Sequence, residues 1–325
     1  MEQIKSENER VIDHFGRMTL NDFSSITGKT SASLLQEIGR INREKQVFNG
    51  RRVSPEQSWL YLKSQGMRSS FKSIAFTSLK GGVGKTISSV TLATRAQQFG
   101  FKTAILDMDS QGSSTLALDC RVTDDDPLFI DVWEDPDSVS DALVQMRERL
   151  FLLPSSLYNG MLDTELNTPD KQKQAVHSTL QSLKKNNFNL VVVDCPPSLG
   201  TAVISTIAAV DTVVIPVTSD PFSLHGLDLT ISEIEAICKS FNVKKPQIRI
   251  LFTKYDKREK LSGRTYDYLQ KKYRQMLLPD PVPTSTQFSK ALDQRASIFE
   301  IPGQYPAKKR YDKFVRNILG LSKII

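Results

Sequence analysis

The sequence predicts an α/β protein, with a mainly parallel, doubly wound sheet and helices on both faces, preceded by a small winged helix-turn-helix domain. Two observations support this fold class. Short apolar runs alternate with long amphipathic segments from residue 73 onward, which is typical of a buried parallel sheet. The first 66 residues instead follow the order helix, turn, helix, hairpin and helix. We therefore expect two domains, 1–68 and 69–325.

The composition is that of a folded protein in a reducing compartment. Hydrophobic residues make up 39% and charged residues 24% of the 325 positions, which supports a core and argues against wholesale disorder. The polar N-terminus has no signal-peptide core, and no apolar run approaches the roughly 18 residues of a spanning helix. We expect a cytoplasmic protein without a disulfide framework, because its cysteines are few and far apart: Cys120, Cys195 and Cys238.

The N-terminal elements are predicted from their caps. Thr19 can cap a short helix that ends at Gly28, and a second helix begins at residues 30–31 with apolar residues at helical spacing. An Asn-Gly pair within 47–53 indicates a hairpin, and a Ser-Pro-Glu-Gln run at 54–57 begins the next helix. A generic helical cap fits this pattern as well as a winged helix-turn-helix does. Basic residues on the second helix and the turn favour DNA recognition: Arg40, Arg43, Arg51 and Arg52.

Five apolar runs predict the strands of the main domain. They are rich in Val, Ile, Leu and Phe, and several end in a polar or acidic residue. In parallel sheets of this kind, ligands bind beyond the carboxyl ends of the strands. The runs occupy residues 73–79, 102–107, 188–194, 212–217 and 247–253.

A glycine-rich loop, KGGVGKT at 80–86, follows the first strand and opens a helix. Its glycines let backbone N–H groups surround phosphate oxygens, and the helix N-terminus adds partial positive charge. The ordinary Walker A spacing fails because Leu79 stands where its first glycine belongs, but the deviant form KGGxGK[ST] is complete. Lys85 can reach the β- and γ-phosphates and Thr86 can bind Mg²⁺. The expected nucleotide-binding residues are Gly81, Gly82, Val83, Gly84, Lys85, Thr86 and Ile87.

Acidic residues follow two further strands. Asp107 and Asp109 come after the second strand, and Asp194 ends the third. Mg²⁺ keeps several waters, so one carboxylate near the metal and another near the attacking water suffice for phosphoryl transfer. A single strand-end aspartate is often only a cap. Three of them on a phosphate-binding sheet predict a phosphoryl-transfer site.

The motifs KGGVGKT, DMDSQGSST and VVVDCPPS, in this order, resemble the deviant Walker A ATPases of the ParA/MinD group. Over residues 70–305 the runs VIPVTSDPFSLHGL, LFTKYDKR and VPTSTQFSKALDQRASIF are similar to the partition ATPase ParA, and the N-terminal layout resembles its long form. The resemblance implies ATP/ADP and Mg²⁺ as cofactors. It implies that Lys80 reaches the partner's nucleotide across a dimer and that Asp109 positions the attacking water. It places Asp107 and Asp194 near the metal, and Thr253 and Pro283 near the adenine.

Two residues depart from the family pattern. Ile87 replaces the usual second Thr or Ser, which removes a hydroxyl that could bond the α-phosphate. Ser110 replaces the usual proline of DxDPQG. We expect activity to survive and nucleotide affinity to be the quantity affected, because neither residue touches the metal or the water.

The net charge of +7 conceals an asymmetry. Residues 241–325 hold 19 basic and 7 acidic side chains (+12), whereas 67–240 carry −7 and 1–66 carry +2. Such asymmetry indicates contact with a polyanion, although solvated lysine-rich helix faces are the alternative. We expect non-specific DNA contacts from some of Lys257, Arg258, Arg264, Lys271, Lys272, Lys308, Lys309, Arg310 and Arg316.

These features predict a nucleoid-associated DNA-partition ATPase. The resemblance implies a homodimer that sandwiches ATP, binds bulk DNA, and hydrolyses ATP slowly until a ParB-like centromere-binding protein stimulates it. The N-terminal domain would bind operator DNA and repress its own operon. One alternative is a MinD-like membrane-associated ATPase that uses the amphipathic residues 311–325. The other is a nucleotide-switched transcriptional regulator without a hydrolytic cycle.

Overall fold

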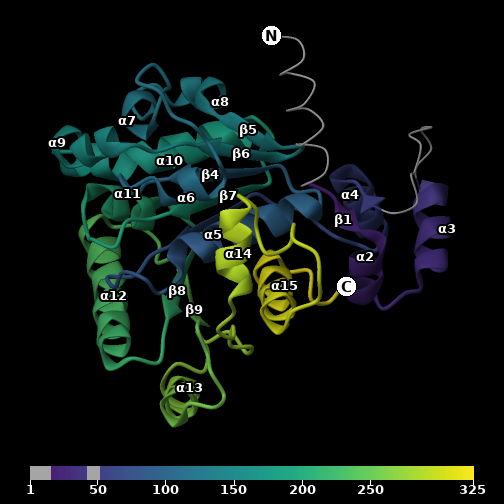
Figure 1. Ribbon diagram of the computed structural model, residues 1–325. Coiled ribbons are helices and arrows are strands. Elements are labelled where there is room, and N and C mark those ends of the chain that lie inside the picture. Colours follow the sequence, from purple (N-terminus) through teal and green to yellow (C-terminus); the bar gives the residue numbers. More distant parts are fainter. Residues whose placement is uncertain (1–15, 42–51) are drawn as a thin grey trace.

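The computed structural model describes residues 16–41 and 52–325, and its centre is a seven-stranded sheet (Figure 1). The strand order is β5-β6-β4-β7-β3-β8-β9. All neighbouring strands run parallel except the edge strand β5, which is antiparallel to β6, and this confirms a mainly parallel sheet. The strands are β3 (Lys72–Phe76), β4 (Thr103–Asp107), β5 (Val144–Arg147), β6 (Leu150–Leu153), β7 (Leu190–Asp194), β8 (Thr212–Val217) and β9 (Gln247–Phe252).

All five predicted strands are present, with small differences at their ends. The first ends at Phe76 rather than Leu79, because the chain leaves the sheet there to form the glycine loop. Strands β5 and β6 were not predicted from the sequence. The apolar run of β6 is only four residues long, and β5 is a half-exposed edge strand with a weak apolar pattern. Runs this short do not distinguish a strand from a piece of buried helix.

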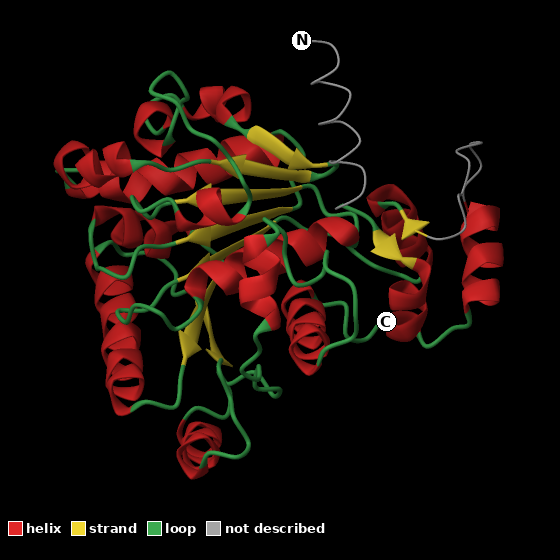
Figure 2. Ribbon diagram, in the orientation of Figure 1, coloured by secondary structure: helices red, strands yellow, loops and turns green. Residues whose placement is uncertain are grey.

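Helices cover both faces of the sheet, and alternate strand residues face each layer (Figure 2). Ile74, Phe76 and Val192 belong to one apolar cluster, whereas Ala75 and Val193 belong to the other. The first layer holds α5 (Lys85–Gln98), α6 (Ser113–Ala117), α14 (Gln287–Asp293) and α15 (Pro306–Leu319). The second layer holds α7 (Phe129–Val132), η1 (Pro136–Ser138), α8 (Val139–Ala142), η2 (Leu157–Met161), α9 (Leu162–Glu165), α10 (Pro169–Lys185), α11 (Thr201–Ala209), α12 (Pro221–Ser240) and α13 (Lys260–Lys272).

The N-terminal helices begin and end at the predicted caps. Thr19 Oγ1 accepts a hydrogen bond from Asp22 N at 3.1 Å, and Gly28 ends the helix with φ 70°. Ser54 and Gln57 form a capping box, with bonds of 3.2 and 2.9 Å. The elements are β1 (Met18–Thr19), α2 (Leu20–Thr27), α3 (Ser31–Ile41), β2 (Arg52–Val53) and α4 (Pro55–Ser64).

The predicted hairpin at 47–53 lies mostly outside the described residues. Within them, Val53 pairs antiparallel with Met18, so β2 forms a small sheet with the strand that precedes α2. The described part therefore contains the two helices of the expected motif and one pairing beside them. The winged helix-turn-helix assignment stays a prediction.

The N-terminal elements share one apolar core with the main sheet. Phe23 and Leu62 belong to the same cluster as Phe101 at the end of α5. Gly100 shows how closely the two parts approach, because a Cβ there would lie 2.3 Å from the Pro55 carbonyl oxygen. The domain boundary at 68/69 stays a prediction, since the core continues across it.

The C-terminal helix α15 lies on the sheet beside α5 (Figure 1). Its apolar residues Tyr311, Phe314 and Val315 are buried, and the Tyr311 hydroxyl bonds the Ser88 hydroxyl at 2.7 Å. Packing therefore accounts for the amphipathic pattern that suggested a membrane helix. Among the described residues, no helix has the length and apolar character needed to cross a bilayer.

Candidate nucleotide site

The glycine loop connects β3 to α5 and is shaped by its glycines. Gly82 and Gly84 have φ of 73° and 95°, a backbone region that favours glycine. The neighbouring strand supports the loop, because the buried Thr253 hydroxyl donates to the Val83 carbonyl oxygen at 2.7 Å. Helix α5 then begins at Lys85. Its first N–H groups have no partner within the helix, so the arrangement suits an anion.

Lys85 is buried at the start of α5, with 8% of its surface exposed. Its Nζ lies 3.3 Å from the Lys80 carbonyl oxygen and 3.5 Å from that of Ser78. Burial lowers the pKa of Lys85, and the charges of Asp194 and Asp109 act in the opposite direction. A buried ammonium that contacts carbonyl oxygens is a good partner for a phosphate.

Two carboxylates lie side by side at the carboxyl ends of β4 and β7. Asp107 and Asp194 are register partners, and both are fully buried. Burial, together with the charge of the neighbouring Asp194, raises the pKa of Asp107 to about 7. Burial also raises the pKa of Asp194. When two acids are buried side by side, ionising both costs a large free energy unless a cation lies beside them.

The donor set fits Mg²⁺. The Thr86 side chain is close enough to Asp194 to lower the pKa of that carboxyl, so a hydroxyl and two carboxylates lie near one another beside the glycine loop. Among the residues that the structure describes, no group of three or more His, Cys, Asp or Glu side chains could hold a metal alone. Mg²⁺ suits this arrangement because it typically keeps waters and takes phosphate oxygens as ligands.

Asp109 and Lys80 lie at the rim of the site. The Asp109 backbone N–H donates to Asp107 at 3.3 Å, and its carboxylate accepts a bond from Gln111 N at 3.0 Å. Lys80 pairs with Asp220 of its own chain and lies 5.9 Å from the ring centre of Phe222. Phe222 is 81% exposed. The expected reach of Lys80 to a partner subunit stays a prediction.

The two residues predicted beside the adenine lie next to the loop. Thr253 follows β9 and bonds both Val83 and Val217 through its hydroxyl, so it supports the loop backbone. Pro283 pairs with Tyr255, two residues beyond Thr253. Their contact with a base stays a prediction.

The side chains that hold the carboxylates were not predicted from the sequence. Ser89 and Ser114 donate to Asp194 at 3.1 and 2.7 Å, and Thr115 donates to Asp107 at 2.8 Å. Asp220, which pairs with Lys80, was also missed. Ser114 and Thr115 come a few residues after Asp109, and this run of hydroxyls behind the acidic motif was the available signal.

The basic residues expected to contact DNA divide by burial. Lys308 is only 6% exposed and lies 3.7 Å from Asp22, so its place among exposed DNA contacts is corrected. Arg316 is largely covered and bonds Asp312 at 2.8 Å, which corrects its assignment too. Arg43 and Arg51 lie outside the described residues. The others are exposed or half-exposed: Arg40, Arg52, Lys257, Arg258, Arg264, Lys271, Lys272, Lys309 and Arg310.

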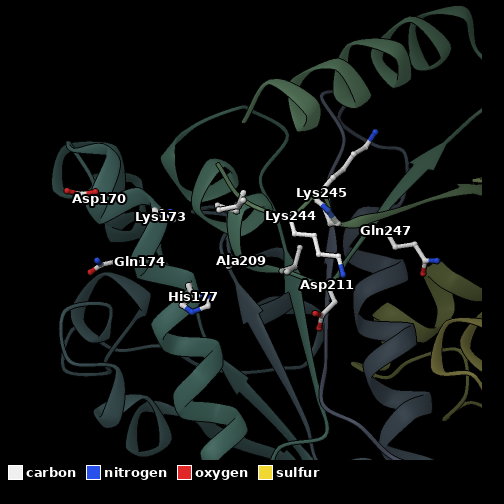
Figure 3. A pocket seen from close by; sticks show the side chains of 13 residues that line it. Asp170, Lys173, Gln174, His177, Ala209, Asp211, Lys244, Lys245 and Gln247 are labelled. Carbon is white, nitrogen blue, oxygen red and sulfur yellow. The ribbon is translucent and has the colours of Figure 1, made fainter. Parts of the chain in front are cut away.

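A separate groove of about 700 Å³ lies at the amino ends of β8 and β9 (Figure 3). Lys244 and Lys245 on one wall and His177 on α10 line it together with Asp211. Asp211 is already bonded by the Ser73 hydroxyl at 2.8 Å. The glycine loop lies at the opposite ends of the strands, so this groove is not part of the nucleotide site.

A family model described as "AAA domain" matches residues 71–250, more than half of the chain. The match runs from just before β3 into β9 and contains the glycine loop, Asp109 and Asp194. The chain belongs to this AAA-domain family. The N-terminal helices lie outside the matched residues.

Relatives of this AAA-domain protein include a sporulation initiation inhibitor and a chromosome-partitioning ATPase. Sporulation initiation inhibitor protein Soj of Bacillus subtilis is 29% identical over 221 residues, 68% of this chain and 87% of Soj. Chromosome-partitioning ATPase Soj of Treponema pallidum is 27% identical over 252 residues, 77% of this chain and 97% of that protein. The solved ATP complex of Cyanothece McdA is similar in fold, with TM-score 0.71, 21% identity and coverage of 79% and 100%.

Proposed function

We propose that this protein is a ParA-type ATPase that partitions DNA. The observation that carries the proposal is the meeting of Lys85, the glycine loop and the paired acids Asp107 and Asp194 at one edge of the sheet. The loop and Lys85 bind the phosphates, and Asp109 holds the attacking water. Thr86, with Asp107 and Asp194 nearby, would hold Mg²⁺, which would supply positive charge beside the phosphates. The name of the Treponema pallidum relative, a chromosome-partitioning ATPase, supports this reaction for the chain.

The rim of the site supports the proposal that the protein dimerises on ATP. Lys80 is held by Asp220 beside the exposed ring of Phe222, and Leu116 is also exposed near the loop. Exposed apolar side chains around a phosphate site favour burial against a second subunit. In the dimer, Lys80 leaves Asp220 for the partner's nucleotide.

DNA binding is assigned to the exposed basic residues around α13, which follows the edge strand β9 (Figure 1). Lys257 and Arg264 are exposed there, and such side chains suit phosphate contacts without base reading. The ATP dimer would bind bulk DNA through this surface, and a centromere-binding partner would stimulate hydrolysis. Arg40 on α3 would contribute to operator binding by the N-terminal domain.

The hydrolytic step is tested with Asp109→Ala. Steady-state ATPase is measured with Mg²⁺, with and without bulk DNA, and Asp125→Ala on an exposed loop serves as the control. We expect Asp109→Ala to lower kcat by about 100-fold or more, as a lost catalytic group does. Turnover equal to that of the wild type would instead favour the nucleotide-switched regulator.

The DNA surface is tested by matched charge reversals. The pair Lys257→Glu and Arg264→Glu is compared with Lys173→Glu and Lys244→Glu, which change the net charge equally at the groove of Figure 3. We expect only the first pair to weaken ATP-dependent DNA binding and flatten its salt dependence. Equal weakening by both pairs would show a general charge effect and overturn the assignment. Binding of the wild type to anionic liposomes instead of DNA would favour the membrane alternative.

A further inference from the structure

Helix α6 joins the loop that carries Asp109 to both buried carboxylates. Thr115 donates to Asp107 Oδ2 twice, from its backbone N and from Oγ1, each at 2.8 Å. Ser114 Oγ donates to Asp194 Oδ2 at 2.7 Å. Both hydroxyl-bearing residues are buried, and the helix begins directly after the loop at Gly112. One short helix therefore bonds two adjacent strand ends.

The Thr115 hydroxyl has a fixed orientation. Its oxygen accepts a hydrogen bond from Ser155 N at 3.0 Å. A hydroxyl has a single proton, and the short contact with Asp107 uses it as a donor. The hydroxyl is thus held between the carboxylate and the backbone that follows β6.

Asp107 also bonds the loop that carries Asp109, so a fixed Asp107 side chain holds this loop in place. Its second oxygen, Oδ1, accepts the backbone N–H of Asp109 at 3.3 Å. The loop is closed further by the bond from Gly112 N to the Asp109 carbonyl oxygen at 2.8 Å. A Cβ at Gly112 would lie 3.0 Å from the Ser155 carbonyl oxygen, so the loop packs closely on the same segment that fixes Thr115.

We propose that Thr115 and Ser114 are positioning residues for hydrolysis. Thr115 holds the Asp109 loop through Asp107, and Ser114 orients Asp194 from the same helix. Both act through the carboxylates rather than by touching the nucleotide. The kinetic consequence rests on the proposed ATPase function, whereas the hold on the loop does not depend on it. Buried partners of this kind behind a site commonly change activity by about 10- to 100-fold.

The test compares Thr115→Val, which keeps the shape and removes the hydroxyl, with Thr115→Ser, which restores it. Ser114→Ala tests the second hydroxyl, and Ser113→Ala on the same helix is the control. The readouts are kcat and KM for Mg²⁺-ATP, the Kd for a fluorescent ADP analogue without Mg²⁺, and amide hydrogen exchange of residues 108–112 in the ligand-free protein. Circular dichroism checks that each variant is folded.

We expect Thr115→Val to lower kcat by about 10- to 100-fold, with a change of less than about threefold in ADP affinity, and to speed exchange at 108–112. Thr115→Ser should recover most of both losses, Ser114→Ala should lower kcat less, and Ser113→Ala should match the wild type. Unchanged kcat and exchange in Thr115→Val would overturn the proposal. If Thr115→Val does not fold, Thr115→Ser must still keep wild-type exchange. If the wild type lacks ATPase activity, the proposed function fails, and exchange alone still decides the positioning role.

Discussion

The two ends of helix α5 each bury a basic side chain, in opposite surroundings. At the first residue, Lys85 contacts backbone carbonyl oxygens at 3.3 and 3.5 Å. Near the other end, Arg95 is 1% exposed and bonds Asp312 at 2.8 Å and Gln98 at 2.7 Å, with Asp22 at 3.6 Å. Its guanidinium also lies 4.4 Å from the ring centre of Phe299. Lys85 is therefore available to bind an anion, whereas Arg95 is already paired with the carboxylates of Asp312 and Asp22.

The acids near the two ends show the same contrast. Burial would raise the pKa of Asp22, but the charges of Arg95 and Lys308 hold it below the usual value. Burial raises the pKa of Asp107 to about 7, with no basic side chain among the causes of its shift. The cluster of Arg95, Asp22 and Asp312 contains both charges, so it stabilises the fold and joins the N-terminal α2 to α5 and α15. The buried pair of Asp107 and Asp194 instead indicates a site for a positively charged ligand.

The largest expected effect comes from removing Arg95, the basic side chain that pairs with buried acids near the end of α5. Arg95→Met leaves Asp22 and Asp312 buried without their main partner, which should lower the free energy of unfolding by about 3–5 kcal/mol. Urea denaturation measures this change, and Arg264→Met on the exposed surface of α13 is the control. Affinity for ADP should stay within about threefold of wild type. An unchanged denaturation midpoint would show that the cluster does not stabilise the fold.

The second prediction concerns the removal of Lys85, the buried lysine at the start of α5. Lys85→Ala should weaken ADP binding by about 100-fold or more, roughly 2.8 kcal/mol, because the phosphates lose their buried cation. The unfolding midpoint should change less than in Arg95→Met, since Lys85 contacts carbonyl oxygens whereas Arg95 bonds buried acids. Titration with a fluorescent ADP analogue measures the affinity, with Lys185→Ala on the exposed end of α10 as the control. Retained affinity would show that the nucleotide binds elsewhere.

The third prediction concerns pH. A buried acid whose pKa is raised from 3.8 to about 7 stabilises the fold below pH 4, and that contribution is lost as the pH rises through 7. The ligand-free protein should therefore lose stability between about pH 4 and about pH 7, and Asp107→Asn should reduce this loss. Thermal melting at several pH values, without nucleotide or Mg²⁺, measures both proteins. Equal pH dependence in the two would contradict the assigned origin.

The smallest expected effect on stability tests whether Lys308 has a structural role rather than a role in DNA binding. Lys308→Met removes charged bonds to Asp22 and to the carbonyl oxygens of Ile301 and Gly303, which should lower stability by about 1–3 kcal/mol. DNA affinity should not change, because the buried ammonium cannot reach a phosphate. The exposed neighbour variant Lys309→Met is the control, with unaltered stability. A loss of DNA binding in a folded Lys308→Met protein would restore the original assignment.

Most of the fold and the centre of the site could be predicted because their signals are local. The five apolar runs are strands, and the cap residues Thr19 and Ser54 begin helices where expected. The β5–β6 hairpin escaped prediction because its strands are short and one is half-exposed. Lys308 was misassigned because a basic residue next to Lys309 and Arg310 looks exposed in the sequence. Its burial depends on Asp22, at the other end of the chain.

The sequence by itself determined the glycine loop, the acids that end the strands and the family, because each depends on the order and spacing of nearby residues. Only the tertiary structure decided which charges are compensated. The sheet brings Asp107 beside Asp194, and the packing of α2 and α15 on α5 surrounds Arg95 with acids. Burial and pairing arise from contacts between distant segments. For that reason the sequence identified Lys85 through its motif, whereas only the structure showed that Arg95 on the same helix is buried and paired with acids.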